Sequence, residues 1–398
     1  MKIIFLEWYS YGNQDIIDAF NELGHEVVKV KADQEKGRGD INEVNRLKEE
    51  FEKANADLIF SFNYWPAVSL AAKELDMTYV SWVYDSPHVV MFSYTVIYPK
   101  NYVFCFDKQL VNQFRTAGIN TVYYLPLAAN PDRLSKLNDY KMFNATKWAV
   151  QKSISFVGSL YTTTNGDNPF FNRLDGINDY TRGYINGLME SQRKVYGYNF
   201  IEEMLKNSPD IVEEMKRVLP MQPNPEGVET VEYLFAQYVI NRQITHLDRM
   251  EVVSKVSDRF GMDLYTRDED FTLPGLVNHG RIDNYGMAPY VFKKSKINLN
   301  ITLRSILSGI PLRAFEIIGA GGFLISNYQP DFDDCFIAGE DYVFYESIED
   351  LMDKIDYYLS HESDRKAIAE SGLNRIRENH TYLHRVQEML GIIGENNG

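Results

Sequence analysis

Strand-like and helix-like segments alternate along the first third of the chain, and this alternation restricts the possible folds more than any other feature. The segments KIIFL, EVVKV, DLIFSF and TYVSWVY are short and rich in β-branched or aromatic residues, as strands usually are. Helical patterns follow them at about 14–23, 41–54 and 67–75, and another at about 109–116 separates FCF from TVYYLP. This order predicts a parallel sheet with helices on both faces, which is a Rossmann-like domain.

The same pattern begins again after a polar stretch, at SISFVG. We therefore expect two Rossmann-like domains, at residues 1–150 and 151–398, that face each other across a cleft in an α/β protein. Between about 175 and 260 the apolar spacing becomes helical, which predicts a helical insertion in the second domain. The last helix is expected to pack back on the N-terminal domain.

Composition excludes several classes of function. The 398 residues contain 41 Lys and Arg against 56 Asp and Glu, a net charge of -15 that argues against a nucleic-acid partner. No stretch approaches the roughly 20 apolar residues that a membrane span needs. Cys105 and Cys335 form no C-x-x-C pair, so we expect reduced thiols in a cytoplasmic protein.

The segment GIPLRAFEIIGAGGFLIS, residues 309–326, resembles a glycine-rich nucleotide loop but has the opposite order. A dinucleotide fingerprint runs from a strand through the glycines into a helix, whereas here a helical pattern comes first and a strand follows. The later glycines are therefore interpreted as a helix end and a tight turn. Chemistry is expected at the other end of that helix, where Pro311 is placed at the first helical position.

That helix start predicts an anion site. Backbone N–H groups from Gly309 and Ile310 onward point along the helix dipole, and Arg304 and Arg313 each offer a planar fork for phosphate. Glu316, about one turn further along, is placed to accept hydrogen bonds from ribose hydroxyls. The alternative is that a proline and a glutamate are only ordinary residues of a helix's first turn.

Three further pairs of residues are candidates. Asn298 and Asn300 lie on the polar side of the strand KINLNIT, where they either approach a ligand or anchor the neighbouring insertion. Asp85 and His88 follow a first-domain strand, as a catalytic pair or as a turn with a histidine that lines the cleft. In SYGNQD, Gly12 and Asn13 leave room for a ligand to approach the backbone.

Several of these segments together resemble the CgeB-like branch of the GT-B glycosyltransferases, a family named for a spore maturation protein. They are FVGSLY, the block from 295 to 330, ENHTYLHR, and in the first half WVYDSPH, FCFDK and YLPLAANP. The resemblance implies a GT-B fold in which the second domain holds a nucleotide-sugar donor and the first holds the acceptor. It also implies that no metal and no cofactor is required, because the nucleotide sugar is the donor substrate.

The resemblance assigns roles to individual residues. Glu316 is similar to the ribose-binding glutamate of retaining enzymes that carry two glutamates separated by seven residues, but the first of the pair is replaced by Ser308. Arg281 and Ile282, in the stretch GRID, resemble the loop that holds the base. The basic residue that often follows the strand SISFVG is missing, so phosphate charge falls to Arg304, Arg313 or the helix start.

The expected function is metal-independent and retaining transfer of a sugar from a UDP-sugar to a hydroxyl acceptor, in bacterial surface glycosylation. The alternatives are a sugar-nucleotide epimerase of GT-B build and a non-catalytic GT-B scaffold in cell-surface or spore-coat assembly. If the reaction inverts the anomeric carbon, it needs a base, and His88 or Asp85 is that base. The insertion is an acceptor platform, a surface for homodimer formation, or a region whose aromatic residues pack in its own core.

Overall fold

Two compact units make up the chain in the computed structural model, which describes residues 1–397 except 34–35, 136, 138–139, 163–167 and 169. The first unit comprises Met1–Ala128, Pro223–Glu229 and His380–Gly398; the second comprises Ala129–Gln222 and Thr230–Asn379. The predicted boundary at residue 150 comes too late. Residues after Ala128 pack on the second unit, where the hydroxyl of Tyr265 donates to the carbonyl of Trp148 at 2.8 Å.

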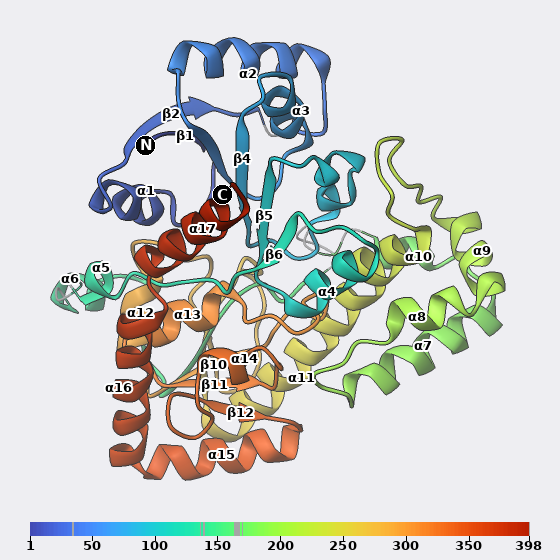
Figure 1. The fold of residues 1–398 in the computed structure, drawn as a ribbon. Helices are drawn as coiled ribbons and strands as arrows, with labels where there is room; N and C mark the ends of the chain where they lie inside the picture. The colour runs from blue at the N-terminus through green and yellow to red at the C-terminus, as the bar shows by residue number, and fades with distance from the viewer. Residues whose placement is uncertain (34–35, 136, 138–139, 163–167, 169, 398) are drawn as a thin grey trace. The chain divides into compact units, whose positions relative to one another are not determined.

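The first unit contains six parallel strands in the order β2-β1-β3-β4-β5-β6 (Figure 1). The strands are β1 Lys2–Glu7, β2 Glu26–Lys31, β3 Leu58–Phe62, β4 Thr78–Val83, β5 Asn101–Cys105 and β6 Val122–Tyr124. The helices are α1 Asn13–Glu22, α2 Ile41–Ala54, α3 Pro66–Glu74, α4 Lys108–Thr116 and α17 Tyr382–Asn397, with 3-10 turns η2 Val89–Phe92 and η3 Tyr94–Ile97. The predicted Rossmann-like architecture is confirmed.

Both faces of this first sheet are covered, which explains why its central strands are apolar throughout. On one face Leu47 of α2, Ala71 of α3 and Val111 of α4 join a core with the sheet. On the other face Phe20 of α1 packs edge-on against Phe60, with ring centroids 5.3 Å apart. Helix α17 lies beside α1 in the same unit.

The second unit contains six parallel strands in the order β12-β11-β10-β7-β8-β9. They are β7 Ile154–Val157, β8 Met262–Tyr265, β9 Leu276–Asn278, β10 Ile297–Asn300, β11 Leu324–Asn327 and β12 Val343–Tyr345. The helices outside the insertion are α5 Pro131–Ser135, α6 Tyr140–Asn144, α12 Ala288–Lys294, α13 Leu312–Gly319, α14 Phe332–Cys335, α15 Ile348–Ser360 and α16 Glu362–Asn379. Helix α12 and strand β9 were not predicted, because each is too short to show a period.

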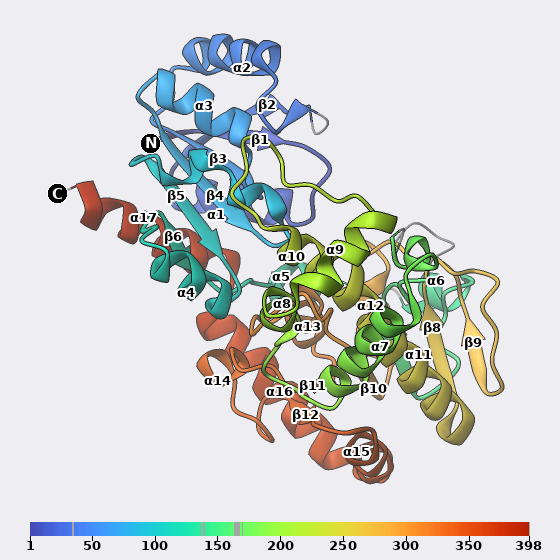
Figure 2. The same ribbon diagram turned by 90° about the vertical axis from the view of Figure 1, so that its right-hand side faces the viewer.

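The predicted helical insertion lies between β7 and β8 (Figure 2). Its elements are η4 Phe171–Leu174, α7 Asp179–Arg193, α8 Ile201–Lys206, α9 Pro209–Val218, α10 Val231–Leu234, the π-helical turn η5 Phe235–Ile240 and α11 Asn241–Phe260. It has its own apolar core, which includes Ile185, Met215 and Phe235. Helix α11 extends beyond that core and packs Val253 and Val256 against the sheet. The insertion is thus fixed to the sheet along one long helix.

The GAGG segment ends α13 as predicted. Gly321 has φ +76°, a left-handed conformation that favours glycine, and its N–H donates to the carbonyl of Ile318 at 2.9 Å. The N–H of Gly322 donates to the carbonyl of Ile317 at 2.9 Å, and β11 begins at Leu324. A Cβ at Gly322 would lie 2.7 Å from the carbonyl oxygen of Phe292, so this turn requires glycine. These glycines end a helix rather than hold a nucleotide.

None of the helices in the described part of the chain combines the length and the apolar character that a bilayer crossing requires.

Candidate functional site

The second sheet has one topological switch point, between β7 and β10. From β7 the chain continues through β8 and β9 on one side, whereas β10, β11 and β12 extend the sheet on the other. In open α/β sheets, ligands bind in the crevice outside the carboxyl ends of the strands at such a point. The site is therefore sought around the ends of β7 and β10.

Arg249 of α11 closes part of this crevice. Its Nη1 donates to the carbonyl of Ser159, just after β7, at 2.6 Å, and its Nη2 donates to the carbonyl of Ile301, just after β10, at 2.6 Å. Its guanidinium also lies over the rings of Phe156 and Tyr161. Arg249 thus places a positive charge at the end of β7, although the segment that directly follows β7 contains no basic residue. Sequence analysis missed it, because one arginine in a charged helix carries no signal.

The start of α13 is the helix end at which the sequence predicts an anion site. Helix α13 begins at Leu312, one residue later than expected, and Pro311 is its N-cap residue. Proline has no side-chain acceptor for the first backbone N–H groups, so the N–H groups of Leu312 and Arg313 remain available to a bound anion.

Arg313 and Glu316 form an ion pair at this helix start. Nη1 of Arg313 donates to Oε2 of Glu316 at 2.6 Å, and Nη2 donates to Oδ1 of Asn284 at 2.9 Å. The guanidinium also lies over the ring of Phe292, with 5.3 Å to the centroid. These contacts use two of its five N–H donors and hold the group in one place, so the others can meet phosphate oxygens.

Asn284 is a second residue that sequence analysis missed. It lies four residues after Gly280 in the loop between β9 and α12, and it joins that loop to α13 through Arg313. In the same loop Arg281 is exposed and its carbonyl accepts from Nε1 of Trp148 at 2.9 Å. Ile282 is 6% exposed, so its side chain packs inward and only its backbone can contact a ligand. The structure therefore joins this loop to α13, and its contact with the base stays a prediction.

Gly309 and Ile310 lie in the loop between β10 and α13, and both are buried. The carbonyl of Gly309 is 3.5 Å from Nε2 of Gln329, and Ile310 is 2% exposed. The helix does not reach them, so their N–H groups do not belong to its first turn as predicted. They shape the approach to α13 instead.

Arg304 has a structural role rather than the predicted phosphate-binding one. Its Nε donates to Oδ2 of Asp248 at 2.7 Å, its Nη1 to the carbonyl of Val195 at 2.8 Å, and its Nη2 to the carbonyl of Arg193 at 3.2 Å. Its guanidinium lies over the ring of Tyr196, 4.6 Å from the centroid. All three nitrogens are engaged, so Arg304 fastens the insertion to the sheet.

This assignment predicts that the variant Arg304→Met loses stability and keeps nucleotide affinity. Removing one partner of a nearly buried ion pair costs about 3–5 kcal/mol of unfolding free energy. We expect a clearly lower urea midpoint and a UDP dissociation constant within about twofold of the original protein, since twofold is under 0.5 kcal/mol. If Arg304→Met is stable but binds UDP much more weakly, the structural assignment is wrong and Arg304 binds phosphate.

The two asparagines of β10 differ in role. Asn298 is 1% exposed; its Oδ1 accepts from the Ser155 hydroxyl at 3.0 Å and its Nδ2 donates to the carbonyl of Phe292 at 3.0 Å. It therefore anchors the sheet, and the prediction that it faces a ligand is wrong. Asn300, at the strand end, donates to the hydroxyls of Thr302 and Ser326. Its Oδ1 has no hydrogen-bond partner within the described residues, so Asn300 remains a candidate.

In the first unit, Asp85 and His88 follow β4 but do not bond to each other. Asn63, with a positive φ of 57°, donates from Nδ2 to Oδ2 of Asp85 at 2.7 Å. Nε2 of His88 lies 3.1 Å from both the nitrogen and the oxygen of Tyr64. Nδ1 of His88 has no hydrogen-bond partner among the residues described, so it is the atom available for proton exchange. Burial lowers the pKa of His88, which favours the neutral ring that a base requires.

Gly12 and Asn13, also in the first unit, are explained by packing. Gly12 has φ 78° before α1, and a Cβ there would lie 2.5 Å from the hydroxyl of Tyr382. The space that the sequence appeared to leave for a ligand is filled by α17. Nδ2 of Asn13 donates to the carbonyl of Trp8 at 3.0 Å, and its Oδ1 accepts from the hydroxyl of Ser10. Both residues thus have structural roles in this unit.

Solved structures with a similar fold match nearly the whole chain. A glycosyltransferase from Rickettsia africae is 13% identical, with a TM-score of 0.52, over 99% of this chain and 98% of that one. Sucrose-phosphate synthase from Thermosynechococcus elongatus is 11% identical, with a TM-score of 0.54, over 99% and 98%. The Anabaena protein HepE in complex with UDP-glucose is 10% identical, with a TM-score of 0.53, over 99% and 100%. This chain has the GT-B fold.

A family model matches the C-terminal part of the chain. Residues 244–391 match the family described as "Glycosyl transferase-like", and this range includes most of α11, strand β10 and helix α13. No curated protein matches the chain significantly. The resemblance to glycosyltransferases is confirmed at this level, whereas the CgeB-like branch stays a prediction.

Proposed function

We propose that the protein is a glycosyltransferase that takes a sugar from a nucleotide diphosphate sugar, with UDP as the nucleotide. The observation that carries the proposal is the start of α13, where Arg313 is held between Glu316 and Asn284. The glycosyl transferase-like match over residues 244–391 supports it, as does the UDP-glucose complex of the similar HepE structure.

In this proposal each group has a separate task. The diphosphate lies against the first N–H groups of α13 and the free N–H groups of Arg313, and Glu316 accepts from the ribose hydroxyls. The backbone of Arg281 and Ile282 meets the base. Arg249 adds positive potential near the end of β7. These cations stabilise the charge that develops on the departing diphosphate, so they act most strongly in the transition state.

The proposed outcome is retention of the anomeric configuration without a metal ion. An oxygen of the departing diphosphate then takes the acceptor proton, and no paired carboxylates are needed. The acceptor is a hydroxyl compound, which we assign to the first unit. For an inverting reaction Nδ1 of His88 is the base, and His88→Gln would lower turnover at least about 100-fold. The variant is assayed with the same sugar acceptor as the original protein. Full turnover in His88→Gln would show that His88 is not the base, and the diphosphate oxygen would remain the group that takes the proton.

His88 also predicts how stability depends on pH. Its pKa lies below the ordinary value of 6.5 in the folded protein because burial disfavours the charged ring. Below pH 6.5 the unfolded chain binds the proton first, so acid lowers stability, while above pH 6.5 the residue contributes no slope. The difference in melting temperature between neutral and mildly acidic buffer should therefore shrink in His88→Gln. His25 and His384, whose pKa values burial also lowers, and carboxyl groups with lowered pKa values such as Glu43 and Glu251 contribute to the remaining slope. An unchanged difference would contradict this assignment.

One observation favours a second candidate, a non-catalytic scaffold of the same fold. Ser308 stands where the glutamate pair would have its first member, and it is 4% exposed. A scaffold would bind a nucleotide without turning it over. The epimerase alternative would convert its nucleotide sugar with no acceptor present.

One experiment separates these functions. The purified protein is incubated with radiolabelled UDP-glucose, UDP-galactose and UDP-N-acetylglucosamine in turn, with and without a mixture of glycan acceptors and with and without EDTA. The proposal predicts label in an acceptor and free UDP, unaffected by EDTA. A new nucleotide sugar without acceptor indicates an epimerase, and binding with no product indicates a scaffold.

A further inference from the structure

A cavity in the second unit lies apart from the residues proposed for the nucleotide. It has a volume of about 360 Å³ and opens at the carboxyl ends of β10, β11 and β12, beneath the insertion. Thr302, Asn327 and Tyr345 contribute from the sheet side, and Tyr196 contributes from the insertion. Its volume falls within the range of small-molecule sites, about 300–1,000 Å³. Neither Arg313 nor Glu316 lines it.

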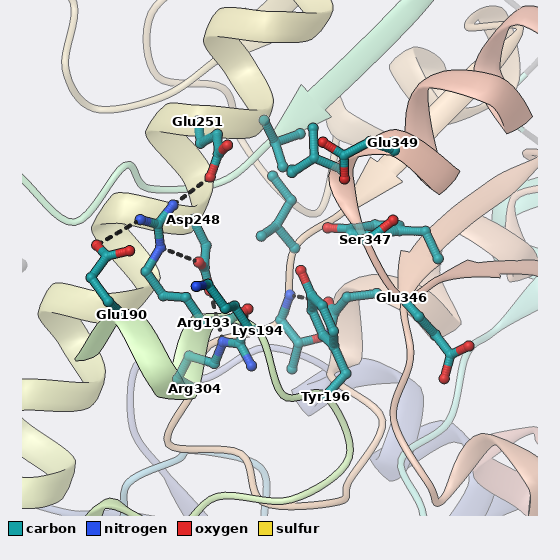
Figure 3. A pocket seen from close by; sticks show the side chains of 16 residues that line it. Glu190, Arg193, Lys194, Tyr196, Asp248, Glu251, Arg304, Glu346, Ser347 and Glu349 are labelled. Atoms are coloured by element: carbon teal, nitrogen blue, oxygen red, sulfur yellow. Dashed lines mark hydrogen bonds and ion pairs between the residues drawn. The ribbon is translucent and has the colours of Figure 1, made fainter. Parts of the chain in front are cut away.

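The charges around this cavity argue against an anionic ligand. Five carboxylates and three cations line it, so the net charge of its wall is negative. Arg193 is held by Glu190, Asp248 and Glu251, and Arg304 is held by Asp248 and two carbonyls. Figure 3 shows this Arg193 cluster on one side of the cavity and Glu346, Ser347 and Glu349 on the other. The guanidinium groups of Arg193 and Arg304 already donate to these acceptors, so they are poorly placed to bind a phosphate.

The cavity wall also carries polar groups that lack partners. Tyr345 is 1% exposed, and neither its hydroxyl nor that of Tyr196 has a hydrogen-bond partner in the described part of the chain. The two rings meet edge to face at 6.0 Å. Both tyrosines line the cavity and neither hydroxyl is fully buried, so each can form a hydrogen bond to water or to a ligand there. The side-chain carboxylates of Glu346 and Glu349 are exposed, and they have no hydrogen-bond or ion-pair partner among the described residues.

We propose that this cavity binds a neutral sugar residue of a carbohydrate. Sugar hydroxyls both donate and accept, so they can meet the phenol groups of Tyr196 and Tyr345 and the free carboxylates of Glu346 and Glu349. The two aromatic rings supply an apolar surface for the ring of the sugar. The negative net charge of the cavity wall repels an anion such as a nucleotide diphosphate, whereas it does not repel a neutral ligand. The proposal does not depend on the nucleotide site, and the two can fail separately.

Binding is tested by saturation-transfer NMR on the full chain with the methyl glycosides of glucose, galactose, mannose and N-acetylglucosamine in the millimolar range. The proposal predicts that at least one glycoside receives saturation and that saturating UDP does not displace it. Tyr196→Phe and Tyr345→Phe, which keep the rings, should each weaken binding about 3- to 10-fold through the loss of one hydrogen bond. Tyr180→Phe, at an exposed tyrosine of α7, is the matched control and should leave binding unchanged.

A cationic occupant is the main rival, and spermidine is its probe. The double variant Glu346→Gln and Glu349→Gln keeps acceptor atoms but removes two charges, so it should weaken a glycoside only a few-fold and spermidine more than tenfold. The proposal is wrong if no glycoside receives saturation, if the tyrosine variants and the control behave alike, or if only spermidine binds. Glu316→Gln should lose UDP affinity and keep glycoside binding, which separates this site from the nucleotide site.

Discussion

Glu316→Gln is expected to raise the dissociation constant for UDP about 10- to 100-fold. The carboxylate is proposed to accept hydrogen bonds from ribose hydroxyls, and hydrogen bonds to a charged group contribute about 1.5–3 kcal/mol each. The stability of the protein without nucleotide should change little. The pair with Arg313 is partly exposed, with both side chains 19% accessible, and such pairs contribute about 0–1 kcal/mol. Titration calorimetry gives the affinity, and urea unfolding gives the stability.

The matched control for this variant is Glu370→Gln, an exposed glutamate of α16 in the same unit. It changes charge by the same amount and should leave UDP affinity unchanged. Equal affinity for the two variants would mean that Glu316 only orients Arg313 or has no part in nucleotide binding. In that event Arg313→Met is measured as well. If Glu316 acts by orienting Arg313, Arg313→Met should weaken UDP binding.

Asp263→Ala is expected to lower the unfolding free energy by about 3–5 kcal/mol, the cost of breaking a buried charged cluster. Asp263 of β8 is fully buried, and its Oδ2 accepts from the N–H groups of Gln151 and Lys152 at 2.9 and 2.7 Å. Its Oδ1 lies 2.7 Å from Nε2 of His279, on which Tyr265 stacks. The substitution removes the acceptor of all three donors, of which His279 is buried. Urea unfolding measures the loss.

Asp353→Ala, at an exposed position of α15, is the control and should stay within about 0.5 kcal/mol of the original protein. Asp263→Asn should fall between the two, because the amide oxygen still accepts one hydrogen bond. His279 directly precedes the loop of Gly280 and Arg281, so Asp263→Ala should weaken UDP binding as well. A variant as stable as the control would show that the cluster contributes little.

The order of strands and helices could be predicted from sequence because it depends on local periodicity. Residues 41–54, for example, alternate apolar and charged residues with a helical period, and α2 spans those residues. The boundary between the units could not be read in this way. Trp148 and its neighbours lie in a polar stretch, and their assignment to the second unit depends on contacts with Tyr265 and Arg281 that are distant in sequence.

In the candidate site, too, residues with a local sequence signal could be predicted, and residues placed by contacts between distant segments could not. Glu316 and Arg313 could be found because they lie within about one and a half helix turns of a proline and follow a recognisable segment. Arg304 was given the wrong role, because sequence shows that a side chain can bind phosphate but not that Asp248 and two carbonyls already occupy it. Arg249 and Asn284 were missed for the converse reason. Their positions at the strand ends and beside α13 arise from packing between distant segments.

The most direct test of the account is titration calorimetry of the full chain with UDP in the presence of EDTA, repeated with GDP, ADP and NAD. The account predicts one UDP site per chain, weaker binding of the other nucleotides, and at least about tenfold loss of UDP affinity in both Glu316→Gln and Arg313→Met. Absence of UDP binding, or UDP binding that both variants leave intact, would contradict a donor site at the start of α13.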